Sequence, residues 1–230
     1  DEAVEAYDNA LNLYPEYADA GIARAQKGRG DSLARLGKQD DALAAYSASV
    51  EATDEAISAF NNATPLDKAV SFTFDPYPLD QKFWTDRGNA LNGLGREQEA
   101  RQAYEKALEW AERSIQQSPQ DFNAYDNKAK ILFELSRCNE SIQVYDQFIE
   151  TNPGPKASAT ALVWKGLLLF EMGRANESRE NLSRAIEVDP QSDKAWRWKA
   201  GISAELGRYE EALAAYDEAL RLRGLEGDAG

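Results

Sequence analysis

The chain has 230 residues, of which 43% are hydrophobic and 29% are charged, a composition typical of a folded globular protein rather than a disordered or collagen-like one. With 26 lysines and arginines against 40 aspartates and glutamates, its net charge of −14 would repel phosphate backbones and anionic lipids, so we expect neither nucleic acid nor a membrane as partner. It has no histidine and a single cysteine, Cys138, which removes the commonest general base, the commonest metal ligand and any internal disulfide.

The beginning of the chain is informative. No run of about 18 apolar residues occurs and no basic-then-apolar leader is present, so we expect neither a transmembrane segment nor a signal peptide. The first segment, Asp1 to Leu13, resembles the second half of a helical unit. We therefore expect the chain to be an excised fragment or a mature product.

One pattern of residues recurs along the chain. A basic and a small residue are followed by a Leu-Gly turn or its equivalent, then by a small and a large residue. In chain order the copies contain Arg29-Gly30, Leu36-Gly37, Ala42 and Tyr46; Arg87-Gly88, Leu94-Gly95, Ala100 and Tyr104; Lys128-Ala129, Leu135-Ser136, Ser141 and Tyr145; Lys165-Gly166, Met172-Gly173, Ser178 and Leu182; Lys199-Ala200, Leu206-Gly207, Ala212 and Tyr216. Ala3, Tyr7, Ala10 and Pro15 form the end of an earlier copy.

This pattern resembles the tetratricopeptide repeat family. The resemblance implies an all-α fold, a right-handed α-solenoid in which every unit is a helical hairpin. The expected boundaries are 1–15 for the second half of a leading unit, 16–63 for unit 1, 64–80 for an irregular insertion, 81–119 for unit 2, 120–153 for unit 3, 154–190 for unit 4, 191–224 for unit 5 and 225–230 for a tail. Small residues let two helices approach, a left-handed glycine ends the first helix, and prolines separate units.

The interval between turns is longest from Gly37 to Gly95, well above the family period of about 34 residues. Part of the excess should lengthen the second helix through Glu51 to Asn61, and Leu108 to Gln117 should extend a later second helix in the same way. The segment 64–80 is too rich in proline and β-branched residues to continue a helix. We expect it to pack its aromatic residues on the convex side; the alternative is an arm that touches the groove or a partner.

Catalytic chemistry has little support, so we expect no enzyme, no cofactor and no metal. Cys138 has no histidine to activate it and is interpreted as a half-buried packing residue. The acidic pairs Asp40-Asp41 and Glu210-Glu211 begin second helices, where negative charge favours the helix dipole.

A basic residue precedes the small residue of every first helix, and we call these five residues the basic ladder: Arg29, Arg87, Lys128, Lys165 and Lys199. They could form a strip for acidic ligands. We favour a structural role, in which their stems pack and their charged ends pair with second-helix carboxylates such as Glu105, Asp146 or Asp217.

The family resemblance implies that partner segments lie along the concave face made by successive first helices. The residues expected to bind a partner there are Asn127, Lys130, Phe133, Trp164, Leu167, Phe170, Lys194, Arg197 and Trp198. Trp164 and Trp198 are one repeat period apart and would be apolar anchors. The alternative is that both tryptophans belong to the core between helices.

Some members of the family hold acidic chaperone tails with a clamp of Lys, Asn, Asn, Lys and Arg. The corresponding residues here are Thr85, Asn89, Asn127, Thr160 and Trp164, so all three cations are missing. We therefore expect no useful affinity for such tails.

The sequence thus predicts a non-enzymatic scaffold that binds a protein or peptide on its concave face. The alternative is a structural segment that associates with other copies through uncapped ends, since Leu220 to Gly230 offers only a short tail. A cytoplasmic location is favoured, while glycosylation sequons at Asn62, Asn139, Asn176 and Asn181 leave export open.

Overall fold

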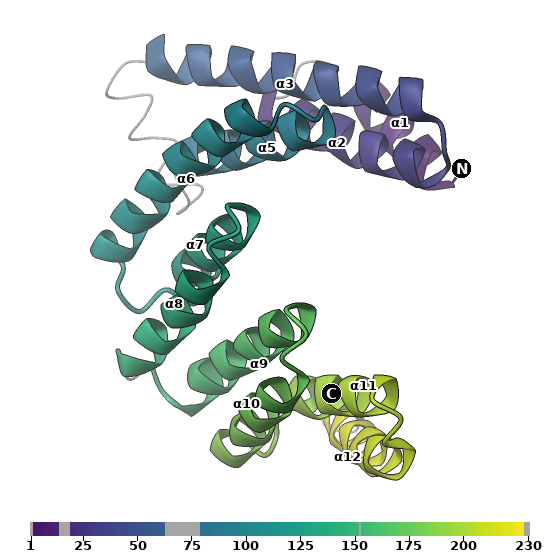
Figure 1. The fold of residues 1–230 in the computed structure, drawn as a ribbon, viewed down its shortest axis with the longest axis vertical. Coiled ribbons are helices and arrows are strands. Elements are labelled where there is room, and N and C mark those ends of the chain that lie inside the picture. The colour runs from purple at the N-terminus through teal and green to yellow at the C-terminus, as the bar shows by residue number, and fades with distance from the viewer. Residues whose placement is uncertain (1, 14–18, 63–78, 152, 228–230) are drawn as a thin grey trace. The chain divides into compact units, whose positions relative to one another are not determined.

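The computed structural model describes residues 2–13, 19–62, 79–151 and 153–227, and every regular element in these ranges is an α-helix (Figure 1). The all-α helical-repeat class expected from the sequence is confirmed. None of the helices in these ranges is both long enough and apolar enough to cross a bilayer. Most of the expected insertion 64–80, and Pro15 before it, lie outside the described residues.

The chain divides into two compact units, each made of several repeats, and these are called the first unit and the second unit. The first unit spans Asp1–Gln117. Its helices are α1 (Glu2–Leu13), α2 (Asp19–Arg35), α3 (Gln39–Asn62), α5 (Leu79–Gly93) and α6 (Glu97–Gln117). The helices α2 and α3 form one hairpin and α5 and α6 another, and α5 also packs against α3 and α2. The two long second helices expected from the sequence are present as α3 and α6.

The second compact unit spans Ser118–Gly230. Its helices are α7 (Phe122–Glu134), α8 (Cys138–Glu150), α9 (Pro155–Glu171), α10 (Ala175–Val188), α11 (Asp193–Glu205) and α12 (Tyr209–Gly227). They pair as three hairpins, and α8 packs on α9, α10 on α11, and α9 on α11. The first helices α7, α9 and α11 therefore belong to successive hairpins.

Two predicted boundaries differ from the observed ones. The helix α5 begins at Leu79, inside the segment expected to be irregular, and α12 continues to Gly227, past the expected end at 224. In the sequence Pro78 immediately precedes α5, and proline is compatible with a helix start. Gly224 does not end α12, because one glycine costs a helix only about 1 kcal/mol relative to alanine.

In each described hairpin, the turn between the two helices contains one residue with a left-handed backbone conformation. Gly37, Gly95, Gly173 and Gly207 have φ between 71° and 75°, and Ser136 has φ 59° at the same place between α7 and α8. The backbone N–H of the next residue then donates to a carbonyl in the last turn of the first helix, as from Arg137 to Leu132 at 2.8 Å. The expectation of left-handed residues at these turns is confirmed.

At three of its five positions the basic ladder pairs with a carboxylate of the preceding second helix. Arg29 Nε lies 2.7 Å from Asp8 Oδ1, and Arg87 Nε lies 2.6 Å from Asp54 Oδ1. In the second unit Lys165 Nζ lies 2.6 Å from Asp146 Oδ1, a pairing expected from the sequence. The side chains of Arg87 and Lys165 are largely buried, so the ladder has a structural role at these positions.

Lys199 differs from these three residues. Its Nζ lies 5.8 Å from the centre of the Trp196 ring, and it makes no ion pair within the described part of the chain. The preceding second helix, α10, carries Ser183 where α8 carries Asp146, so no carboxylate faces it. An ion pair of Lys199 with Asp217 is not formed, because Asp217 lies on α12, the helix that follows Lys199, and not on the preceding helix.

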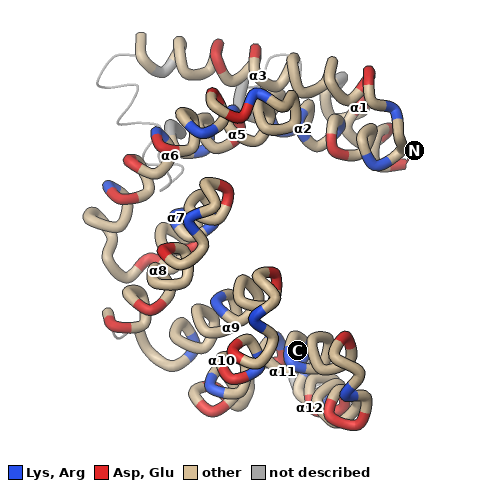
Figure 2. The backbone as a smooth tube through the Cα atoms, viewed as in Figure 1, with Lys and Arg blue, Asp and Glu red and all other residues tan. Residues whose placement is uncertain are grey.

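Basic and acidic residues are interspersed along the helices of both units (Figure 2).

The strained turn residue Ser136 gives a stability prediction. Replacing Ser136 with glycine should raise the free energy of unfolding by about 0.5 to 1 kcal/mol, because glycine adopts the left-handed conformation without the Cβ clash. The matched reverse change, Gly173→Ser, should lower it by about 1 kcal/mol, since a Cβ there meets no other atom within 4 Å and only the backbone preference changes. Urea denaturation would measure both changes, and a shift of the two variants in the same direction would contradict this explanation.

Candidate functional site

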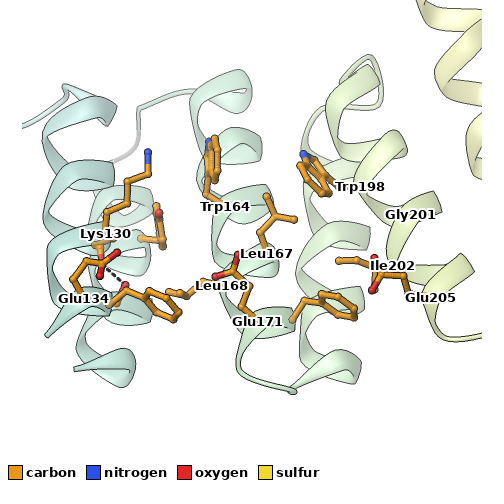
Figure 3. Close-up of a pocket in the computed structure, with 15 residues that line it drawn as sticks. Lys130, Glu134, Trp164, Leu167, Leu168, Glu171, Trp198, Gly201, Ile202 and Glu205 are labelled. Carbon is orange, nitrogen blue, oxygen red and sulfur yellow. Dashed lines mark hydrogen bonds between the residues drawn. The ribbon is translucent and has the colours of Figure 1, made fainter. Parts of the chain in front are cut away.

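A groove runs across the first helices of the second unit. It encloses about 550 Å³ and is lined by α7, α8, α9 and α11 (Figure 3). The lining residues are Ala129, Lys130, Phe133, Glu134, Ser141, Tyr145, Trp164, Leu167, Leu168, Phe170, Glu171, Trp198, Gly201, Ile202 and Glu205. This volume is within the usual range of pockets that bind ligands.

Two tryptophans from neighbouring first helices open into this groove. Trp164 on α9 is half-buried, and Trp198 on α11 is 41% exposed. Figure 3 shows both indole rings standing on the same side of the groove with their nitrogen atoms directed the same way. Trp198 is therefore not a core residue, whereas the exposure of Trp164 is intermediate.

The floor between the tryptophans is apolar. Leu167 and Phe170 of α9 are half-buried and pack against the core cluster that includes Leu182 and Ile202. Phe133 of α7 lines the same groove from the neighbouring hairpin. The floor is thus continuous with the hydrophobic core and cannot collapse without disturbing it.

Two lysines, Lys130 of α7 and Lys194 of α11, lie close to the ring of Trp164. Lys130 Nζ lies 5.1 Å from the ring centre and Lys194 Nζ lies 4.5 Å from it. Both distances are within the range of cation–π attraction. Lys130 Nζ also donates to Asp126 Oδ2 at 2.6 Å, and this bond to a residue one turn earlier on α7 holds the lysine in position.

Six of the nine residues expected to bind a partner line the groove, and they are Lys130, Phe133, Trp164, Leu167, Phe170 and Trp198. Lys194 lies at its edge through the contact with Trp164. Asn127 and Arg197 do not line it. Arg197 Nε instead pairs with Asp193 Oδ2 at 3.2 Å on its own helix.

Sequence reasoning missed three glutamates of the groove: Glu134, Glu171 and Glu205. Each stands two residues before the left-handed turn residue of its hairpin, in the sequences Glu-Leu-Ser, Glu-Met-Gly and Glu-Leu-Gly. That repeated spacing was visible in the sequence and could have identified them. Their exposure and their position beside the tryptophans could not be deduced from it.

Tyr145 forms the polar part of the groove wall. Its hydroxyl donates to Asp126 Oδ1 at 2.9 Å. Burial raises the pKa of Tyr145 well above its usual range, and the carboxylates of Asp126 and Glu171 raise it further because they oppose a second negative charge. The hydroxyl therefore stays protonated and acts as a structural donor.

The described residues offer no cluster typical of metal binding. No group of three or more acidic or cysteine side chains that could hold a metal ion occurs among them. Cys138 is half-buried at the first residue of α8, in agreement with the packing role expected for it.

A second hollow of about 790 Å³ lies in the first unit between α3, α5 and α6. Long polar side chains such as Arg101, Gln102 and Lys106 line it, and the ion pair of Arg87 with Asp54 lies within it. Trp84 is the single aromatic residue that lines it, whereas five aromatic residues line the groove of the second unit, which makes that groove the better candidate site.

Comparison with known proteins identifies the class of this protein. Two family models, each described as tetratricopeptide repeat, match the chain, one over residues 1–57 and 165–226 and the other over residues 81–114. The first match alone covers more than half of the chain. The chain belongs to the tetratricopeptide repeat family, and like other members it is a protein-interaction scaffold.

Several solved structures are similar to the chain. A crystal structure of MamA is 17% identical with a TM-score of 0.45, over 86% of this chain and 96% of that one. MamA from Desulfovibrio magneticus RS-1 is 15% identical with a TM-score of 0.42, over 88% and 95%. BtubC from P. vanneervenii is 17% identical with a TM-score of 0.46, over 98% and 89%. A search of curated proteins found no match.

The raised pKa of Tyr145 predicts an alkaline loss of stability. The unfolded chain releases this proton near pH 10 whereas the folded chain keeps it, so the free energy of unfolding should fall as the pH rises above about 10. Tyr145→Phe should remove part of that fall, at a cost of about 1 kcal/mol at neutral pH for the lost hydrogen bond.

Denaturation of both proteins between about pH 8 and pH 11 would measure the difference, with Tyr209→Phe, at a 73% exposed position, as the control. Identical pH dependence of the wild type and Tyr145→Phe would contradict the prediction.

Proposed function

We propose that the groove of the second unit binds a segment of a partner protein, with Trp164 and Trp198 as its anchors. The observation that carries this proposal is the pair of accessible indole rings above an apolar floor in a cavity of about 550 Å³. Tryptophan is over-represented among the residues that dominate binding energy at protein interfaces. An accessible apolar floor supplies the area that a partner must bury.

The polar groups of the groove favour a protein ligand over a reacting substrate. Lys130 is paired with Asp126, and the hydroxyl of Tyr145 is bonded to the same carboxylate. These groups are therefore engaged in holding the groove wall. Together with the absence of histidine from the sequence, this supports a binding role without catalysis.

Truncating the exposed anchor should weaken binding. Peptides selected from a random phage-displayed library on the wild-type protein would serve as ligands. Trp198→Ala should bind them about thirtyfold more weakly, about 2 kcal/mol, as measured by calorimetry. Trp110→Ala, the same truncation on α6 of the first unit, should leave the affinity unchanged.

Two results would contradict the proposal. One is that the selected peptides bind Trp198→Ala as tightly as the wild type. The other is that Trp198→Ala loses its helical circular dichroism, because the indole would then be part of the core.

Self-association is a second candidate function, favoured by an exposed apolar stripe on α12. Its four residues recur at helical spacing on one face, and they are Tyr209, Leu213, Tyr216 and Leu220. Leu220 is 66% exposed. An apolar stripe of this kind is typical of a surface that another helix covers.

In the preceding hairpin, the corresponding residues of α10 are covered by the hairpin that follows. Leu182 and Ile186 of α10 occupy the places of Tyr216 and Leu220, and they pack with Ala195 and Ile202 of the next hairpin. The stripe on α12 is exposed, and a second copy of the chain would cover it in the same way.

If the stripe joins two copies, light scattering should report a dimer or larger species for the wild type. The double variant Leu213→Lys, Leu220→Lys should be monomeric, because charges on both exposed positions would have to be buried in the interface. The matched change Glu180→Lys, Glu187→Lys on α10 should keep the oligomer. A monomeric wild type at about 100 μM, a concentration at which even micromolar interfaces are occupied, would rule out this candidate.

A further inference from the structure

The groove is acidic along one edge. Glu134, Glu171 and Glu205 are the last residues of α7, α9 and α11, and all three are exposed and line the groove. Figure 3 shows their carboxylates on the side of the groove away from the indole nitrogen atoms. We call these three residues the glutamate row.

The charge of the glutamate row is uncompensated. None of the three carboxylates forms an ion pair within the described ranges of the chain. The last turns of α7, α9 and α11 contain no basic residue. The C-terminal end of a helix carries a partial negative charge of its own, so three helix ends add to the three carboxylates.

Helix stability does not account for the row. A carboxylate at a helix C-terminus opposes the helix dipole, whereas a cation there would favour it. At the corresponding places in the first unit, α2 ends with Arg35 and α5 ends with Gly93. The row is thus confined to the hairpins that form the groove.

The opposite edge of the groove carries two lysines, of which Lys130 is paired with Asp126. Lys130 and Lys194 lie close to the Trp164 ring, at 5.1 Å and 4.5 Å from its centre. Figure 3 shows Leu167 of the apolar floor between the Trp164 ring and the Glu171 carboxylate. A ligand on the floor is therefore oriented by charge as well as by its apolar contacts.

We propose that the occupant of the groove is an amphipathic helix of a partner protein, whose apolar stripe is flanked on one side by lysines or arginines that face the glutamate row. This inference rests on the proposed function of the groove and specifies its ligand. The accessible tryptophans and the floor take the apolar stripe, and the row selects a basic flank by charge complementarity.

The spacing of the row favours a helix over an extended segment. Packed helices lie about 8 to 10 Å apart, and α9 packs on α11, so Glu171 and Glu205 should be separated by about that distance. An extended strand covers it in about three residues, which would turn successive basic side chains to opposite faces. A helix covers about 10 Å in seven residues and returns to the same face. Basic residues seven apart on a helix can therefore meet successive glutamates.

Three synthetic helical peptides of about 18 residues, about 27 Å long, would test the inference. All share one stripe of leucines, and they differ only at flanking positions seven residues apart, which carry lysine, glutamine or glutamate. Calorimetry at low salt should show that the lysine peptide binds about tenfold more tightly than the glutamine peptide, and the glutamate peptide most weakly. The preference should shrink as salt is raised toward about 0.5 M.

Charge changes on the protein provide the reciprocal test. The triple variant Glu134→Gln, Glu171→Gln, Glu205→Gln should bind lysine and glutamine peptides equally, with its affinity for the glutamine peptide retained. The control Glu180→Gln, Glu187→Gln, Glu210→Gln removes the same charge from exposed positions on α10 and α12, and it should keep the preference.

The outcomes distinguish a groove that binds no partner from a groove that binds a partner without a basic flank. Equal binding of all three peptides that is lost in Trp198→Ala would keep the groove as a binding site and overturn the basic flank. A preference for the glutamate peptide, or a preference that the control triple variant also abolishes, would overturn it as well. Binding of none of the three peptides, with the phage-selected peptides still bound, would overturn the helical ligand and keep the groove as a binding site.

Discussion

The close approach of two helices at a residue with little or no side chain determines the geometry of each hairpin. A Cβ built on Gly88 would lie 2.6 Å from the ring of Tyr104, so only glycine fits there with the ring in place. At that distance the Tyr104 hydroxyl donates to Asn89 Oδ1 at 2.8 Å on the first helix. The buried aromatic residue thus fixes both the separation of the two helices and their register.

The helix α9 shows how this contact determines the groove. Gly166 faces Leu182 of α10, with only 3.2 Å between its built Cβ and Leu182 Cγ. Its neighbour Lys165 pairs with Asp146 of the preceding hairpin. Successive residues on a helix are rotated by about 100°. Because Gly166 faces α10 and Lys165 faces α8, Trp164 and Leu167 are turned toward the groove and remain accessible there.

The sequence predicted the features that depend on repetition. The left-handed turn residues, the long helices α3 and α6, and six of the groove residues recur at fixed places in the pattern, so their positions follow from the family period. The division into a leading half unit and five full units stays a prediction. The pairing of Lys165 with Asp146 was also foreseeable, because both residues occupy repeated positions.

The sequence did not predict the features that depend on neighbours in space. Lys199 lost its expected carboxylate because the helix facing it is α10, which carries Ser183 there. Arg197 was expected at the groove, but Asp193 one helical turn earlier pairs with it. The glutamate row was missed because an acidic residue near a turn is usually a solvated surface residue, and only the cavity shows what it borders.

The central claim is that the groove of the second unit, with Trp164 and Trp198 at its edge, binds a partner helix. The five indole N–H signals of the protein can be followed by NMR while the lysine-flanked peptide is added. We expect the signals of Trp164 and Trp198 to shift in proportion to bound peptide, with those of Trp84 and Trp110 in the first unit unchanged. Shifts at Trp84 or Trp110 with no change at Trp164 and Trp198 would contradict the claim.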